Sequence, residues 1–281
     1  MNTLMKKIIL AIFLLVLVMA CGGHKESSPI QEETSTDSLV AEVADTTAAD
    51  TEAEEETPPR TVDELFDDFI YAFMEKQHFQ KARIKFPLQY IIEGKDSLIQ
   101  KKNWTFSRLY ADLDIYTMIF YNANEAGIEK DTSVNQVIVD CIDLTNEKVK
   151  QYTFKRNNGH WQLALLKEHN IDMSVDNNFY RFYKEFVTDS LFQRDHIAES
   201  IEFETYDEDM GEDIEGTLDI EQWYEFKPSL PSDMITNITY GKKPADSSER
   251  VLVLSSLSGG MNCKLYFLRE AEHWKLVRFE N

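Results

Sequence analysis

The chain has 281 residues, a formal net charge of −21 at pH 7 and 43% hydrophobic residues, among them 17 Phe, 12 Tyr and 4 Trp. This length suffices for one large domain or two of ordinary size, and the aromatic content can build real cores. Because the chain is acidic and no stretch interleaves Lys or Arg with aromatic residues, we expect no nucleic-acid partner. The negative charge also disfavours adsorption to anionic lipid, so any membrane attachment has to be hydrophobic or covalent.

Residues 1–20 have the pattern of a secretory signal peptide. Lys6 and Lys7 precede an apolar run over residues 8–20. Thirteen residues rise about 20 Å as a helix, less than the roughly 30 Å of a bilayer core. The pattern therefore predicts a cleaved signal and not a membrane-spanning helix.

The signal ends in Val18-Met19-Ala20-Cys21, which resembles the lipobox of bacterial lipoproteins. The resemblance implies cleavage before Cys21 and acylation of its thiol and new amine by fatty acids such as palmitate. Two or three acyl chains hold a protein stably at a bilayer. The membrane, reached through acylated Cys21, is then a partner. No acidic run directly follows Cys21, so we expect an outer-membrane lipoprotein of the cell envelope on the periplasmic face and not the cell surface. The alternative is a plain signal peptide cleaved at a nearby small residue.

Residues 21–60 are expected to form a disordered acidic tether behind the lipidated cysteine. The stretch 22–60 has eleven acids against Lys25 and Arg60, and no Phe, Tyr or Trp. Such a segment buries too little apolar surface to offset the entropy of ordering, and its like charges repel one another. Its expected role is to hold the folded part away from the membrane.

The sequence from residue 61 onward contains an internal repeat. Residues 61–168 align with 174–281 at an offset of 113, and the middle of each copy aligns at an offset of 119. The matched pairs include Phe66 and Phe179, Trp161 and Trp274, Trp104 and Trp223, and Tyr121 and Tyr240. Ordered matches with compensating loop lengths predict a duplicated domain, with copies at 61–170 and 174–281.

Each copy combines one helix with several strands. Residues 62–79 have helical spacing of apolar residues, and the second copy begins an equivalent helix with Asn177 or Asn178 as its cap. The first copy then has strand patterns at 83–92 and 97–104 around a turn at 93–96, at 114–122, at 134–144 and as a pair within 147–167. We expect Trp161, on the last strand, to face the helix. A helix followed by an antiparallel sheet is an α+β plan.

This plan resembles the nuclear-transport-factor-2-like, cone-shaped family. The stretches RIKFPL (83–88), KKNW (101–104) and NGHWQL (158–163) further resemble a Bacteroidetes-type family of putative lipoproteins of unknown function. The resemblance implies two tandem cone-like domains, each an amphipathic helix packed on a curved antiparallel sheet. The second copy reads SIEFETY in place of the KFPL stretch, so the resemblance is weakest at its hairpin.

Enzymes of the cone family place an Asp/His or Asp/Tyr pair inside the cone, which makes the shared residues Asp114, Asp233, His160 and His273 the candidates for a cavity. The alternative, which we favour for all four, is a structural role at strand entries and turns. The acidic loop 204–221 is dense enough to suggest Ca²⁺, but its spacing departs from a calcium-loop pattern. We expect no metal, no cofactor and no catalytic residue, and we expect Cys141 and Cys263 to be buried free thiols.

The resulting hypothesis is a non-catalytic module that binds an unknown small ligand or an envelope protein. The alternative is an enzyme acting on a small apolar molecule in one domain cavity, and the third interpretation is a scaffold with both cones filled. A hollow cone lined by Asp, His or Tyr would favour the enzyme, and a hollow apolar cone would favour ligand binding.

Overall fold

The computed structural model describes residues 60–281 except 126, 208–209, 242–246 and 272. The predicted signal peptide, Cys21 and all but the last residue of the predicted tether lie outside the described residues. In the described part, no helix has both the length and the apolar character needed to cross a membrane.

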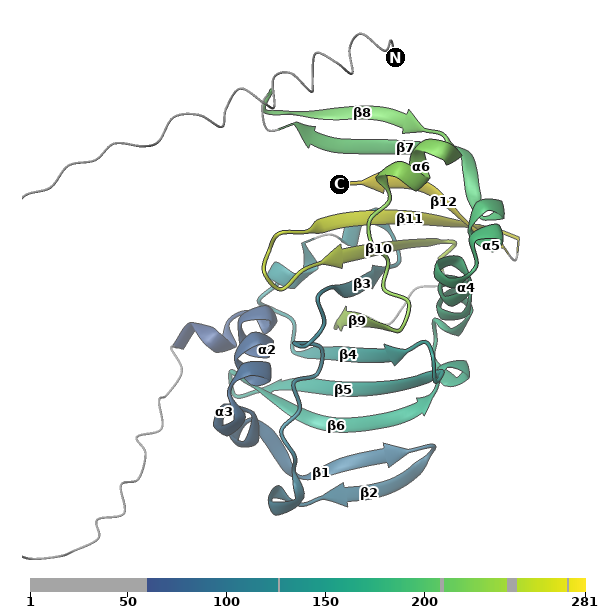
Figure 1. The fold of residues 1–281 in the computed structure, drawn as a ribbon. Helices are drawn as coiled ribbons and strands as arrows, with labels where there is room; N and C mark the ends of the chain where they lie inside the picture. The colour runs from purple at the N-terminus through teal and green to yellow at the C-terminus, as the bar shows by residue number, and fades with distance from the viewer. Residues whose placement is uncertain (1–59, 126, 208–209, 242–246, 272) are drawn as a thin grey trace, which may run out of the picture. The chain divides into compact units, whose positions relative to one another are not determined.

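The first half of the described chain contains two helices and six strands (Figure 1). They are η1 (Arg60–Asp63), α2 (Phe66–Glu75), α3 (Gln77–Ala82), β1 (Ile84–Ile92), β2 (Lys95–Ile99), η2 (Lys101–Asn103), β3 (Tyr116–Phe120), η3 (Ala123–Glu125), η4 (Ile128–Lys130), β4 (Gln136–Asp143), β5 (Lys148–Asn157) and β6 (His160–Asn170), where η denotes a 3-10 helix.

The second half repeats the helix pair and the six strands, with α6 in the place of η2 and no described counterpart of η3 and η4. Its elements are η5 (Ile171–Met173), α4 (Asn177–Thr188), α5 (Ser190–Asp195), β7 (Ile197–Asp207), β8 (Glu212–Leu218), α6 (Ile220–Phe226), β9 (Met234–Tyr240), β10 (Glu249–Ser255), β11 (Asn262–Glu270) and β12 (His273–Glu280). The stretch SIEFETY lies within β7, so the second copy does form the hairpin that its sequence left in doubt.

The twelve strands form two six-stranded sheets. We call them sheet A, in the order β2-β1-β6-β5-β4-β9, and sheet B, in the order β8-β7-β12-β11-β10-β3. Each half therefore contributes five strands to one sheet and its remaining strand to the other. All neighbours are antiparallel except β1 with β6 and β7 with β12.

The expected division at residues 170–174 does not separate the two sheets. The strand predicted over 114–122 forms as β3, but it pairs with β10 of the second half, and β9 pairs with β4 of the first half. The exchange has a physical reason: Ile119 of β3 fills the core under sheet B, and Ile238 of β9 fills the core under sheet A. All described residues accordingly fall within one compact unit.

The helices form because they can bury one aromatic face against a sheet. Phe66, Phe69 and Phe73 of α2 are almost fully buried. Phe66 meets Trp161 edge-on with ring centroids 5.2 Å apart, and the second half repeats this contact between Phe179 and Trp274 at 5.3 Å. The expectation that the tryptophan of the last strand faces the helix is confirmed.

The predicted cap of the second helix is wrong. Asp176 occupies the N-cap position of α4 and makes no capping hydrogen bond, because its carboxylate is bound by other side chains. Asn177 is the first helical residue, and the side chain of Asn178 accepts a hydrogen bond from Trp274 Nε1 at 2.5 Å.

Candidate functional site

Sheet A carries a hollow of about 420 Å³ at the end of the face that α2 covers. Alternate residues of a strand share a face, so Val137, Val139 and Cys141 of β4 point the same way. The two valines lie in the core with α2, and Cys141 packs at its margin. The lining residues come from β1, β4, β5, β6, β9 and nearby loops: Ile92, Glu93, Leu109, Cys141, Asp143, Lys148, Val149, Lys150, Tyr152, Glu168, His169 and Met234.

The floor of the hollow holds a thiol and a phenol that stay protonated. Burial raises the pKa of the Cys141 thiol to about 12, and the nearby Asp140 carboxyl adds to the shift. Burial also raises the pKa of Tyr152 above its usual value, and its hydroxyl lies 3.3 Å from Ser107 Oγ. Because the thiolate is the nucleophilic form of cysteine, Cys141 is a weak nucleophile near neutral pH.

One wall of the hollow is a loop that the buried side chain of Gln80 holds by several hydrogen bonds. Gln80 Nε2 donates to the carbonyl oxygens of Phe73 and Ser107, at 2.9 Å and 2.7 Å. Gln80 Oε1 accepts from Trp104 Nε1 at 2.9 Å and from the Ser107 N–H at 3.0 Å. Gln80 therefore uses both its donors and its acceptor to position the chain that leads to Leu109.

Leu109 lines the hollow in a strained backbone conformation. Its φ is 48°, in the left-handed region. A non-glycine residue held in such a region costs on the order of 1–3 kcal/mol, and strain of this kind clusters at binding and active sites. The hydrogen bonds of Gln80 help to keep this loop in place.

The rim of the hollow carries ion pairs and no large excess of either charge. Lys148 Nζ lies 2.7 Å from Glu93 Oε1, and Lys150 Nζ lies 3.4 Å from Glu168 Oε1. Exposed pairs of this kind contribute only about 0–1 kcal/mol to stability, so they are free to exchange partners with a ligand. Burial and a hydrogen bond with Glu168 raise the pKa of Tyr90 to about 12, so this phenol also stays neutral.

His169 contributes an imidazole ring to the lining of the hollow. It is 3% exposed, and its Nδ1 lies 2.9 Å from the Asn170 carbonyl oxygen. Burial lowers the pKa of this imidazole, which keeps it neutral. Its contact with the backbone indicates a structural role.

The equivalent face of sheet B is filled. At the offset of 113, Cys141 and Tyr152 correspond to Leu254 and Leu265, both fully buried in the second core. Trp223 of α6 is also fully buried there and packs edge-on against Phe279 at 5.6 Å. Its partner in the repeat, Trp104, is only half-buried and is bound to Gln80. The two tryptophans therefore occupy different environments, and the hollow belongs to sheet A.

None of the four predicted cavity residues lines the hollow. Asp114 and Asp233 are exposed just before β3 and β9. His160 and His273 are exposed at the starts of β6 and β12. They lie at the entries of strands and outside this hollow.

Two buried carboxylates 113 residues apart were missed. Asp63 accepts two hydrogen bonds from Arg83 at 3.0 Å and 2.8 Å and one from the Trp161 N–H at 3.0 Å, and it lies 2.8 Å from His160 Nδ1. Burial raises the pKa of Asp63, but the hydrogen bonds outweigh it and lower the pKa below its usual value. The coincidence of Asp63 with Asp176 at the repeat offset could have revealed both.

Asp176 ties α4 to two strands of sheet B, β10 and the end of β3. It accepts a hydrogen bond from the Tyr121 hydroxyl at 2.5 Å and from Arg250 Nη2 at 2.9 Å. The Arg250 guanidinium also lies over the Tyr121 ring, 4.2 Å from its centroid. This arrangement is buried and self-satisfied, which marks it as structural.

No metal centre is found in the described part of the chain, where no three His, Cys, Asp or Glu side chains converge. Asp207 and Asp213 lie in the β7–β8 hairpin, and Asp209 is outside the described residues. Cys141 and Cys263 are both free cysteines.

A comparison with solved structures places this α+β architecture in the nuclear-transport-factor-2-like class. The crystal structure of an NTF2-like protein from Bacteroides fragilis superimposes with a TM-score of 0.72 and 37% sequence identity, over 78% of this chain and 96% of that one. Residues 45–281 match a family described as a domain of unknown function, DUF4348, and the chain belongs to that family. No curated protein matches the chain.

Proposed function

We propose that this protein is a membrane-anchored lipoprotein of the cell envelope whose folded part binds a small ligand, without catalysis, in the hollow on sheet A. The observation that carries the proposal is the difference between the sheets. Sheet A has a hollow of about 420 Å³ where the equivalent face of sheet B is closed by Leu254, Leu265 and Trp223. Small-molecule sites typically occupy about 300–1,000 Å³.

The same proposal includes a duplicated origin for the two halves. They share one strand order, and some hydrogen bonds recur at the offset of 113. Gln80 binds the Phe73 carbonyl as Gln193 binds the Phe186 carbonyl, and the Leu163 and Leu276 N–H groups bind the carbonyls of Arg83 and His196. On this reading two cone-like copies interlock through β3 and β9, and one of them kept its cavity.

The lining of the hollow supports a ligand with an apolar body and a polar end. Leu109, Cys141 and Tyr152 offer apolar surface and one hydroxyl, while Lys148 and Lys150 lie at the rim. Binding without catalysis is supported by the protonated thiol of Cys141 and by the neutral, backbone-bound ring of His169. An enzyme would need a titratable group poised near neutral pH at this place.

Ligand binding is tested with the fluorescent probe 8-anilinonaphthalene-1-sulfonate, which has an apolar body and one anionic group. We expect saturable binding to the full chain in detergent, lost in Cys141→Phe, which fills the floor. Leu98→Phe places the same ring on an exposed strand outside the hollow. It should bind the probe as the wild type does. Equal binding by Cys141→Phe and the wild type would refute the site.

Membrane attachment is supported by the apolar run 8–20 and by the Val18–Cys21 stretch. We expect mass spectrometry of the expressed protein to find an acylated Cys21 at the N-terminus. Cys21→Ser should move the protein out of the membrane fraction, whereas Cys141→Ser should leave it there. An unmodified N-terminus at another residue would overturn this part of the proposal without affecting the ligand site.

A further inference from the structure

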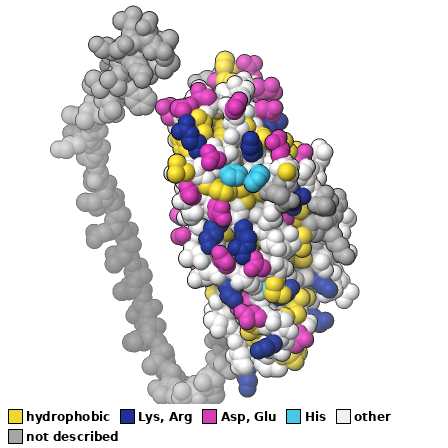
Figure 2. Space-filling view, turned by 90° about the vertical axis from the view of Figure 1, so that its right-hand side faces the viewer, with side chains coloured by type: hydrophobic (Ala, Val, Ile, Leu, Met, Phe, Trp, Pro, Cys, Tyr) yellow, Lys and Arg dark blue, Asp and Glu magenta, His cyan; other side chains and the backbone are white. Residues whose placement is uncertain are grey.

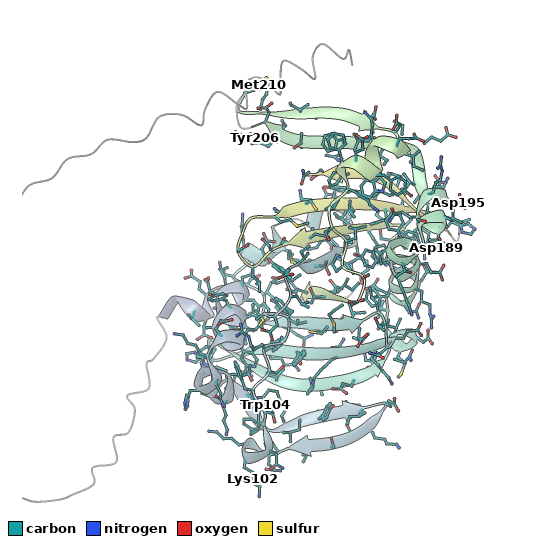
Figure 3. The ribbon with its side chains drawn as sticks, viewed as in Figure 1. Lys102, Trp104, Asp189, Asp195, Tyr206 and Met210 are labelled. Carbon is teal, nitrogen blue, oxygen red and sulfur yellow. The ribbon has the colours of Figure 1, made fainter. Side chains whose placement is uncertain are left out.

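The two hairpins at the ends of the sheets carry opposite charges. Residues 76–102, which we call the basic end, hold seven Lys or Arg and two acids. The equivalent residues 189–215, the acidic end, hold eleven acids and one Arg. Figure 1 shows β1–β2 and β7–β8 at opposite ends of the described part, and Figure 3 labels Lys102 at one and Tyr206 and Met210 at the other. In Figure 2, acidic side chains gather at the end that carries β7 and β8.

Each end finishes in a strand with an unpaired edge. β2 is the last strand of sheet A, and β8 is the last strand of sheet B. An edge strand presents a row of backbone N–H and C=O groups that can pair with another strand. Both edges also expose apolar side chains: Leu98 of β2 is 61% exposed, and Ile214 of β8 is 36% exposed.

Several charged side chains at the two ends form no ion pair with another described residue. Among the described residues, no ion pair is formed by Lys85, Lys101 or Lys102 of the basic end. The same holds for the acids of β8, Glu212, Asp213 and Glu215. Like charges facing one another at close range repel, whereas opposite charges attract. Charge therefore disfavours pairing of two basic ends or two acidic ends and favours pairing of one with the other.

We infer that the basic end of one copy binds the acidic end of a second copy, with β2 of the first pairing along β8 of the second. The contact is heterologous, because each copy uses a different surface. The first copy keeps its acidic end free, and the second copy keeps its basic end free. Contacts of this kind build open chains unless their geometry closes a ring. The net charge of −21 opposes association at long range, so the contact is weak in dilute solution and needs to be trapped.

Disulfide trapping tests the contact in the full chain in detergent. One preparation carries Leu98→Cys, and a second, with a different tag, carries Ile214→Cys. Under mild oxidation we expect a cross-linked heterodimer that forms faster at low salt, because salt screens exposed charges. The double variant Leu98→Cys with Ile214→Cys should give a ladder of dimers, trimers and larger species, or a single closed ring.

Matched controls separate the contact from random collision. Tyr71 is 61% exposed, as Leu98 is, but lies on α2 away from both edges. Tyr71→Cys mixed with Ile214→Cys should cross-link much more slowly. Adding Lys101→Glu and Lys102→Glu to the Leu98→Cys chain should reduce its cross-linking rate to that of Tyr71→Cys. Equal rates for Tyr71→Cys and Leu98→Cys, or a rate indifferent to salt and charge reversal, would overturn the inference. The probe-binding result is independent of either outcome.

Discussion

Thr117 of β3 and Thr236 of β9 bind each other reciprocally at the crossing of the two exchanged strands. Each N–H donates to the other hydroxyl, at 2.8 Å and 2.9 Å, and each hydroxyl donates to the other carbonyl, at 2.6 Å and 2.7 Å. Both residues are fully buried and lie 119 residues apart. Four hydrogen bonds thus join the halves at equivalent positions. They stabilise the arrangement in which β3 and β9 are exchanged between the sheets.

Thr117→Val tests how much these reciprocal hydrogen bonds contribute to stability. Valine matches the shape of threonine but leaves the Thr236 N–H and C=O without their partner, so unfolding should require about 2–4 kcal/mol less free energy. Urea unfolding followed by fluorescence measures the difference. Thr239→Val, on β9 and half-buried, is the matched control and should change stability by less than about 1 kcal/mol. Equal effects of the two substitutions would show that the reciprocal bonds contribute nothing special.

Asp176→Asn should destabilise the protein strongly. It removes the charge that pairs with Arg250, 9% exposed at its side chain, and removing one partner of a buried pair costs about 3–5 kcal/mol. The control is Asp172→Asn, whose side chain is 61% exposed and paired with Arg181. An exposed pair contributes about 0–1 kcal/mol. Thermal unfolding compares the two, and a small effect at Asp176 would contradict its structural role.

Asp140 should make stability fall as pH rises. Burial raises its pKa to about 7, although Gln151 Nε2 donates to it at 2.9 Å. Because the folded pKa exceeds the unfolded value of about 3.9, stability is greatest below that value and declines up to about pH 7. Asp140→Asn should remove this decline and be the more stable form at pH 8. Urea unfolding at several pH values measures it.

Asp143, on the same strand, provides a control of opposite sign. Burial opposes ionisation there, but hydrogen bonds from Asn146 and Thr145 lower its pKa. Its contribution is present above the unfolded pKa and is lost as pH falls through the folded pKa. Asp143→Asn should therefore weaken stability at neutral pH. A decline between pH 4 and 7 that persists in Asp140→Asn would contradict the role of Asp140.

Gln80→Leu should loosen the loop that walls the hollow. It leaves buried donors and acceptors of Trp104, Ser107 and Phe73 unpaired, at a cost of about 1–3 kcal/mol for each that water does not reach. We expect lower stability and weaker probe binding. Gln193→Leu is the control from the other half, where Gln193 binds Phe186 and Lys227 and the equivalent face is filled by Leu254 and Leu265. It should lower stability without affecting the probe.

The sequence predicts elements well where periodicity reports burial. The aromatic spacing of α2 and the alternation along β4 to β6 both reflect a face packed on a core. The exchange of β3 and β9 could not be predicted, because a strand has the same apolar pattern whichever sheet it joins. The sequence pattern around Ile119 and Ile238 does not show which of the two cores each side chain fills.

The hollow was equally invisible in the sequence. Cys141 and Leu254 both read as buried apolar residues, and only the structure shows that Leu254 is fully buried in the second core while Cys141 lines the hollow. The four shared cavity candidates stand out in the sequence because they repeat, but none of them lines the hollow. Asp63 and Asp176 repeat as well, at the offset of 113, and that coincidence is the signal by which the sequence identifies the pair.

Alkylation of Cys141 tests the ligand site most directly. Iodoacetamide labelling at pH 9, read by peptide mass spectrometry, compares Cys141 with Cys263, which is 1% exposed in the second core. With 8-anilinonaphthalene-1-sulfonate at about ten times its Kd, occupancy should slow the labelling of Cys141 about tenfold and leave Cys263 unchanged. An unchanged rate at Cys141, at a probe concentration that saturates the fluorescence, would place the probe elsewhere and contradict the proposed site.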